Sequence, residues 1–150
     1  MILISHRGNI NGPKPDREND PKYIFDALDK GYNVEVDIWG VEDNLYFGHD
    51  EPQYKVHVPF IDDTRIWCHC KNIDAVTKIR KINAKFGYNI HYFWHQSDDI
   101  TLTSQGYIWA HPGQQQVKDS IAVLPEIHQD DISVCKGVCS DYIQNYNNAE

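Results

Sequence analysis

Short apolar runs of strand length recur along the whole chain, and this recurrence constrains the fold more than any other feature. The runs are rich in β-branched and aromatic residues, and short polar connections separate them. We expect strands over residues 2–5, 34–39, 66–70, 90–94, 107–110, 121–124 and 138–143.

Helical patterns lie between some of these runs. Residues 21–30 follow Asp20, a good N-cap, begin with a proline and end at Gly31. Residues 74–85 carry apolar side chains at helical spacing and end before Gly87. Later intervals are shorter, so residues 98–104 and 114–118 can hold only a turn or two of helix. Alternating strands and helices favour a parallel sheet, and a parallel sheet of this strand count tends to close.

The length of the chain sets the size of such a fold. Its 150 residues suit one domain over residues 1–150 but fall well below the roughly 250 residues usual for a TIM barrel. We therefore expect the α/β class and a reduced TIM-type (β/α) barrel. It should have about seven to eight mainly parallel strands, with shortened helices in the second half.

The charge balance bears on partners. A net charge of -8 with a pI near 5.4 repels phosphate backbones and anionic lipid surfaces, so no nucleic-acid partner is expected. No apolar run approaches the ~20 residues that span a bilayer, and residues 1–5 have the pattern of a strand rather than of a signal peptide. We expect no stable membrane insertion and a cytoplasmic location, and the oligomeric state stays open.

The four cysteines allow two interpretations. Cys68, Cys70, Cys135 and Cys139 could suggest zinc, but Cys68 and Cys70 are two apart on an expected strand, which is the wrong spacing for a zinc knuckle. We interpret them as reduced thiols that pack in the core.

Acidic and imidazole residues are concentrated in the first 50 positions. Glu35 and Asp37 are two apart on an expected strand, so they share a face and can hold one hard cation. His6 and His49 flank them in the sequence. Because histidine titrates near neutrality, these two can divide proton removal from a nucleophile and proton donation to a leaving alkoxide.

Basic residues complete the pattern. Arg7 offers a planar fork of donors to phosphate oxygens, and Lys71 offers a point charge. Arg7 ends the first run, and His69 and Lys71 end the third. In a barrel the catalytic groups stand at the carboxyl ends of the strands, which is where these residues fall. Together the pattern indicates metal-assisted phosphodiester cleavage.

Four short motifs follow one another in the first 50 residues: Ser5-His6-Arg7-Gly8, Glu18-Asn19, Glu35-Val36-Asp37 and Gly48-His49-Asp50. In this order and at these spacings, the motifs resemble the glycerophosphodiester phosphodiesterase family. Its superfamily includes the phosphatidylinositol-cleaving phospholipases C and the sphingomyelinase D toxins, all built on (β/α) barrels. The resemblance is specific over residues 2–50 and loose afterwards. Weaker, later marks of the same resemblance are Gln96-Ser97 and Ser140-Asp141-Tyr142.

The resemblance implies hydrolysis of a glycerophosphodiester-like substrate to a phosphomonoester and an alcohol. It implies His6 and His49 as acid and base, and Glu35 and Asp37 as ligands of one divalent cation, with Mg²⁺ or Ca²⁺ expected. It also brings Glu18 into the site, as a further ligand or as a support for one.

One position departs from the family pattern. Members usually present a third metal carboxylate as Glu-x-Lys, whereas this chain has His69-Cys70-Lys71. Lys71 keeps the family's phosphate-binding residue. A histidine ligand would favour Mn²⁺ or Zn²⁺ over Mg²⁺ or Ca²⁺. The alternative is a hydrogen-bonded His69 that binds no metal.

Other interpretations stay open. The chain could bind a phosphoester or metal without turnover, or act as a sphingomyelinase D-like phospholipase that forms a cyclic phosphate; a mean hydropathy of -0.60 argues against the latter. His95 ends a run and could face the site or the surface. Trp109 could cap the core or line a substrate wall. Asp141 could close the barrel or orient His6 or Arg7.

Overall fold

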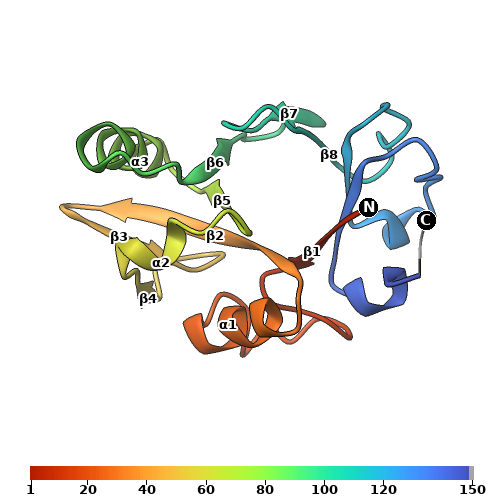
Figure 1. The fold of residues 1–150 in the computed structure, drawn as a ribbon, viewed down its shortest axis with the longest axis horizontal. Coiled ribbons are helices and arrows are strands. Elements are labelled where there is room, and N and C mark those ends of the chain that lie inside the picture. The colour runs from red at the N-terminus through yellow and green to blue at the C-terminus, as the bar shows by residue number, and fades with distance from the viewer. Residues whose placement is uncertain (149–150) are drawn as a thin grey trace.

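The computed structural model describes residues 1–148, which form one curled sheet with few helices (Figure 1). The helices are α1 (Pro21–Asp29), α2 (Val58–Ile61) and α3 (Ile73–Phe86), with short 3-10 helices η1 (Pro125–Ile127) and η2 (Ile143–Tyr146). The strands are β1 (Ile2–His6), β2 (Asn33–Val41), β3 (Asn44–Phe47), β4 (Tyr54–Lys55), β5 (Ile66–Cys70), β6 (His91–Trp94), β7 (Ile100–Leu102), β8 (Ile108–Ala110), β9 (Ile121–Val123) and β10 (Gly137–Ser140).

Parallel pairing connects most of the sheet, in the order β6, β5, β2, β1, β10, β9, β8. The strand β7 lies antiparallel to β8, and β3 and β4 extend β2 as an antiparallel hairpin. The amide of Ser104 donates to the carbonyl of Tyr92 at 2.7 Å, but no ladder joins β6 to β7 within residues 1–148. The α/β class is therefore confirmed as a mixed fold with a curled sheet.

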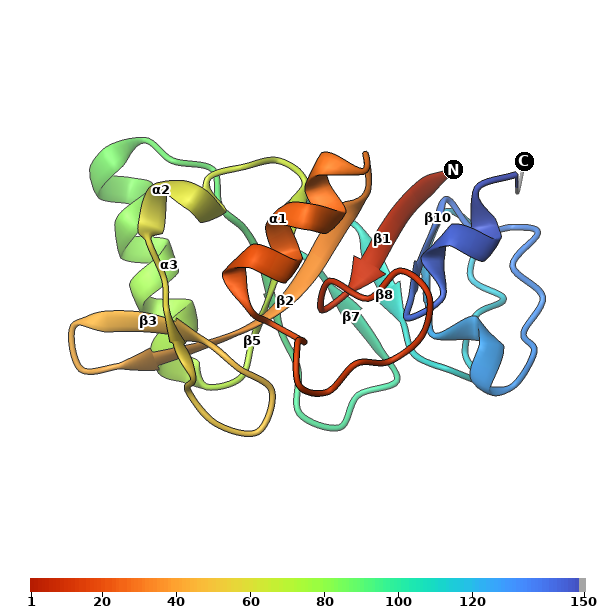
Figure 2. The same cartoon turned by 90° about the horizontal axis from the view of Figure 1, so that it is seen from below.

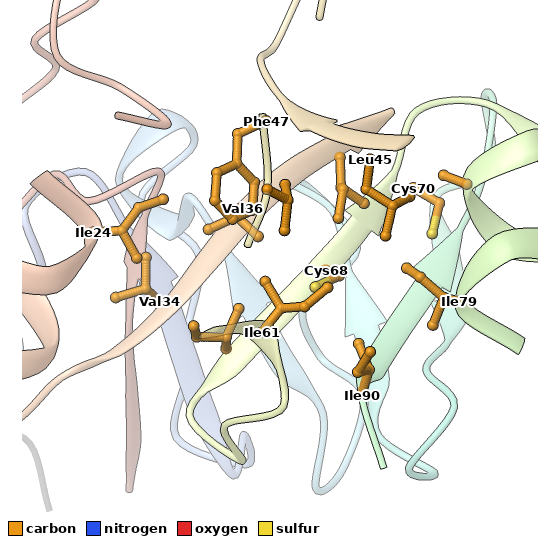
Figure 3. Close-up of a cluster of buried hydrophobic side chains, with 14 of the residues drawn as sticks. Ile24, Val34, Val36, Leu45, Phe47, Ile61, Cys68, Cys70, Ile79 and Ile90 are labelled. Carbon is orange, nitrogen blue, oxygen red and sulfur yellow. The ribbon is translucent and has the colours of Figure 1, made fainter. Parts of the chain in front are cut away.

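Three helices cover the convex face of the sheet around β2 and β5 (Figures 1 and 2). Alternation along β2 sends Val34, Val36 and Ile38 to this face, where they pack against Ile24 of α1 and Ile79 of α3 (Figure 3). All five side chains are fully buried. The opposite positions of β2, which include both carboxylates, are thereby turned to the concave face.

The predicted helices are confirmed with small shifts at their ends. Asp20 accepts from the amide of Lys22 at the start of α1. Gly31 has φ +92°, and Gly87 closes α3 in the left-handed conformation. No helix within residues 1–148 has the length and apolarity required to cross a membrane.

Residues 98–104, which were expected to hold at most a turn or two of helix, contain no helix. This interval holds β7, which turns back through Thr103 and Gly106 to pair with β8; the amide of Gly106 donates to the carbonyl of Thr103 at 2.9 Å. Residues 114–118 contain no helix. The alternating Ile100-Thr101-Leu102 is a strand pattern, and cross-strand pairing outweighs the weak local helix signal. The short helices of the second half follow β9 and β10 instead.

The concave face has its own apolar cluster, built from alternate residues of six strands. Three of the four cysteines are buried and all four are free. Polar side chains take the place of apolar ones toward the carboxyl ends of β1, β2 and β5, where His6, Glu35 and His69 line a cavity. The buried members of this cluster are Ile4, Trp67, Phe93, Trp109, Ile121, Val123 and Cys139.

Candidate active site

Polar side chains from neighbouring strands meet at the carboxyl end of the concave face. The parallel register sets His6 of β1 beside Glu35 of β2, and Asp37 beside His69 of β5. His6, Glu35 and His69 line a cavity of about 270 Å³, whose wall also includes Arg7, His49 and Lys71. The placement expected from the strand ends is therefore what the fold produces for these residues.

Three side chains form a cluster that could hold a metal ion. Glu35, Asp37 and His69 each offer one ligand atom within 4.8 Å of the others. His69 Nδ1 lies 3.3 Å from Asp37 Oδ1 and 4.0 Å from Glu35 Oε1. Both carboxylate oxygens of Glu35 and Oδ1 of Asp37 are buried without a hydrogen-bond partner. Since such oxygens are costly to bury unpaired, this donor set fits a divalent cation.

The two carboxylates differ in their affinity for protons. Burial, together with the charge of Asp37, raises the pKa of Glu35 from 4.5 to about 7. Burial acts in the same direction on Asp37, but the approach of His69 Nδ1 to within 3.3 Å and the charge of Arg7 outweigh it and hold the Asp37 pKa well below its usual range. Without a cation, Glu35 is thus the member of the pair that carries a proton near neutrality.

Asp37 is held from one side. Its Oδ2 accepts from Asn19 Nδ2 at 3.0 Å and lies 3.0 Å from Arg7 Nε. The amide of Asp37 donates to Asn19 Oδ1 at 2.9 Å. These contacts leave Oδ1 facing Glu35 and His69.

Glu18 lies outside the metal cluster. Its Oε1 is 3.2 Å from Arg7 Nη1, and it is absent from the set of ligand atoms that converge. Of the two roles left open for Glu18, the geometry favours support through Arg7. Burial acts to lower the pKa of Arg7. The charges of Asp37 and Glu35 outweigh this effect, so the pKa of Arg7 is raised.

His6 is fixed by a residue near the end of the chain. Its Nδ1 lies 2.7 Å from Asp141 Oδ1, and Asn9 Nδ2 donates to the same oxygen at 2.9 Å. This turns Nε2 toward the cavity, 3.6 Å from Glu35 Oε2. Burial acts to lower the pKa of His6, but the hydrogen bond to Asp141 and the charge of Glu35 raise it above 6.5. Asp141 therefore orients His6.

His49 stands at the rim of the cavity. The hairpin of β3 returns the chain to β2, where the amide of Gly48 donates to the carbonyl of Asp37 at 3.1 Å. The His49 side chain is 42% exposed, and its Nδ1 lies 2.8 Å from Asp50 Oδ1. His49 is thus accessible, whereas His6 is largely buried and oriented by Asp141.

Lys71 also lines the cavity. Its Nζ lies 4.0 Å from Asp37 Oδ1.

Sequence reasoning missed two residues that line or support the site. His111 lines the cavity, and it follows the run 107–110 directly, so the strand-end signal that identified His6 could have found it. Asn19 was noted only as part of the Glu18-Asn19 motif. Its two hydrogen bonds with Asp37 depend on the loop after Arg7, which returns so that the amide of Asn19 donates to the carbonyl of Arg7. Trp109, which stayed open, is buried in the concave cluster and also lines the cavity.

Comparisons with known proteins add no relative. No protein-family model matches the chain, and neither a curated protein nor a solved structure matches it.

The His69 position gives a test of ligand chemistry. If His69 binds the cation, His69→Glu should add a negative charge and shift the preference from Zn²⁺ toward Mg²⁺ or Ca²⁺. The parent should also lose metal affinity as pH falls through the pKa of His69, which burial lowers below the ordinary 6.5, because a ligating imidazole must be deprotonated. Calorimetry with these ions at two pH values would measure both effects. An unchanged ranking of the metals in the variant would exclude His69 as a ligand.

Proposed function

We propose that this chain is a small metal-dependent phosphodiesterase. It hydrolyses a glycerophosphodiester-like substrate to a phosphomonoester and an alcohol, on a reduced form of the TIM-type barrel. The observation that carries the proposal is the set of unpaired buried oxygens on Glu35 and Asp37, beside His69, in a cavity that also contains His6, His49 and two cationic side chains.

Glu35, Asp37 and His69 are the residues that would hold the cation. A bound divalent ion would neutralise charge on the phosphoryl oxygens and orient the substrate. Glu18 supports Arg7 at 3.2 Å, so its guanidinium is held at the cavity wall. We assign Arg7 and Lys71 to the non-bridging oxygens of the phosphate, where a fork and a point charge complement each other.

The two histidines divide the proton transfers. The nucleophile, water or a vicinal hydroxyl of the substrate, gives its proton to one imidazole as its oxygen bonds to phosphorus. The bond from phosphorus to the leaving oxygen breaks, and the other imidazole protonates that oxygen. Where a vicinal hydroxyl attacks, this step gives a cyclic phosphate, and water then opens it to the phosphomonoester. His6 suits the acid role, because Asp141 on its Nδ1 stabilises the protonated form. His49, exposed at the rim, suits the base.

An apolar wall favours one part of the substrate. Trp109, Val123 and Leu124 line the cavity opposite the carboxylates. Such a surface would receive the alcohol portion of a diester, while the charged side chains take the phosphate.

The proposal is tested by assay with and without metal. Purified protein would be given glycerophosphodiesters and an aryl phosphodiester, then chelator, then Mg²⁺, Ca²⁺, Mn²⁺ or Zn²⁺ restored singly. We expect activity to vanish in chelator and return with a divalent ion. Undiminished turnover in protein shown to be free of metal would overturn the mechanism.

Product analysis separates the competing functions. Phosphorus NMR would detect a phosphomonoester for the proposed hydrolysis and a cyclic phosphate for a sphingomyelinase D-like reaction. Metal-dependent binding of a diester without any product would instead identify a binding protein, which the altered third ligand position, His69, would then explain.

A further inference from the structure

Three histidines from different strands form a stack along one wall of the cavity. His69 ends β5, while His95 and His111 follow β6 and β8 directly. The rings of His69 and His95 are 4.5 Å apart and nearly parallel, and those of His95 and His111 are 4.4 Å apart at 60°. His69 belongs to the carboxylate cluster, because its Nδ1 faces Asp37. His95 and His111 have no role in the proposed phosphodiesterase reaction.

The contact between these two rings is a close approach of like atoms. Nε2 of His95 lies 3.2 Å from Nε2 of His111. At this distance one imidazole can donate a hydrogen bond to the other when no ion is present. A hydrogen bond between two neutral imidazoles stabilises little, because it replaces hydrogen bonds to water. His95 Nδ1 is also buried with no partner within the described chain.

The same separation suits two ligands of one metal ion. In a tetrahedral zinc site with bonds of 2.0–2.1 Å, two ligand nitrogens lie about 3.3 Å apart. We propose that His95 and His111 bind a second divalent transition-metal ion through their Nε2 atoms. Imidazole nitrogen selects Zn²⁺, Co²⁺, Ni²⁺ or Cu²⁺ over Mg²⁺ and Ca²⁺. The site lies in the same cavity as Glu35 but shares no ligand with the Glu35, Asp37 and His69 cluster.

The surrounding chain holds both rings. The amide of His111 donates to the carbonyl of Asp99 at 2.9 Å, next to the β7–β8 ladder. His95 is packed against His69, which in turn stacks on Phe93 at 5.0 Å. Both histidines line the open cavity, so the remaining coordination positions of the ion would face solvent or a phosphate oxygen. An ion there would add a positive charge close to the carboxylate cluster, because His95 stacks on His69.

The test measures metal stoichiometry and needs no activity. Parent protein would be dialysed against Zn²⁺ or Co²⁺ alone, and bound metal would be counted by elemental analysis. We expect a second equivalent in the parent, loss of one equivalent in the double variant His95→Gln/His111→Gln, and loss of the other in Asp37→Asn. His57→Gln, an exposed histidine elsewhere, should keep both.

A measurement on the parent alone keeps the proposal falsifiable if the double variant fails to fold. Imidazole ¹H–¹⁵N spectra during a Zn²⁺ titration of the parent should show the Nε2 resonances of His95 and His111 shifting together. A single equivalent in the parent would overturn the proposal, as would two equivalents retained by a folded double variant. Because no substrate is present, failure here is distinct from failure of the phosphodiesterase proposal.

Discussion

Glu35→Gln should abolish turnover and yet make the metal-free protein more stable at pH 8. In the parent the pKa of Glu35 is about 7 against an ordinary 4.5, so between these values the folded state holds a proton that the unfolded state releases. The free energy of unfolding therefore falls as pH rises from 4.5 through about 7. By pH 8 the loss is roughly 3 kcal/mol, and a neutral glutamine avoids it.

Urea unfolding in chelator from pH 5 to pH 8 would measure this difference. The gap between variant and parent should shrink as pH falls and approach zero below 4.5, where Glu35 is protonated in both the folded and the unfolded state. Glu42→Gln, an exposed carboxylate at the turn after β2, should change nothing and serves as the matched control. A Glu35→Gln protein less stable than the parent at pH 8 without metal would contradict the assigned cost of the buried charge.

The activity of the same variant should move the opposite way. Glutamine keeps the shape of the side chain but removes the charge that a cation needs, so affinity for Mg²⁺ should collapse and turnover should fall below detection. Added Mg²⁺ should stabilise the parent and not the variant. Glu35 would thus lower the free energy of unfolding of the metal-free protein and raise it when Mg²⁺ is bound, which is typical of a residue in a binding site.

The local part of this site was predictable from the sequence. Alternation along one strand fixes Glu35 and Asp37 on the face opposite Val34, Val36 and Ile38, whatever the rest of the chain does. The helix ends at Gly31 and Gly87 follow from caps that act over a few residues. These features depend on neighbours in the sequence, and each lies in the structure within a residue or two of its expected place.

Partners distant in the sequence were harder to predict. Asp141 and His6 are separated by 135 residues and meet because β10 pairs with β1. No local pattern gives that sheet order, so the role of Asp141 stayed open. The same holds for the meeting of His95 and His111, which depends on β7 turning back antiparallel to β8.

The strand β7 shows the limit on the fold itself. Its three residues are too short to separate a strand from a turn of helix by periodicity. Pairing with β8 decides the outcome, and pairing is a property of the folded sheet. The antiparallel strand stands where a barrel built only of βα units would have a parallel one. The α/β class was therefore predictable from the sequence, whereas the direction of this strand in the sheet was not.

His6→Ala should lower turnover of an alkyl phosphodiester by roughly 10²- to 10⁴-fold. His6 is largely buried and paired with Asp141, which raises its pKa; this favours the protonated form and suits protonation of the leaving alkoxide. An aryl leaving group needs little protonation, so the loss should be much smaller on an aryl substrate. His49→Ala, which removes the assigned base, should cost a similar factor on both substrates.

Asp141→Asn separates orientation from proton donation. Asparagine can still accept a hydrogen bond from His6 Nδ1 but removes the charge that raises the pKa of His6. An acid must be protonated, so activity falls as pH rises through its pKa. This descending limb should move to lower pH in Asp141→Asn, while activity on the acid side changes less. Rates over the full pH range on both substrates would measure this. If His6→Ala lost equal factors on alkyl and aryl substrates, as His49→Ala should, and Asp141→Asn left the pH profile in place, the separate acid and base roles would be wrong.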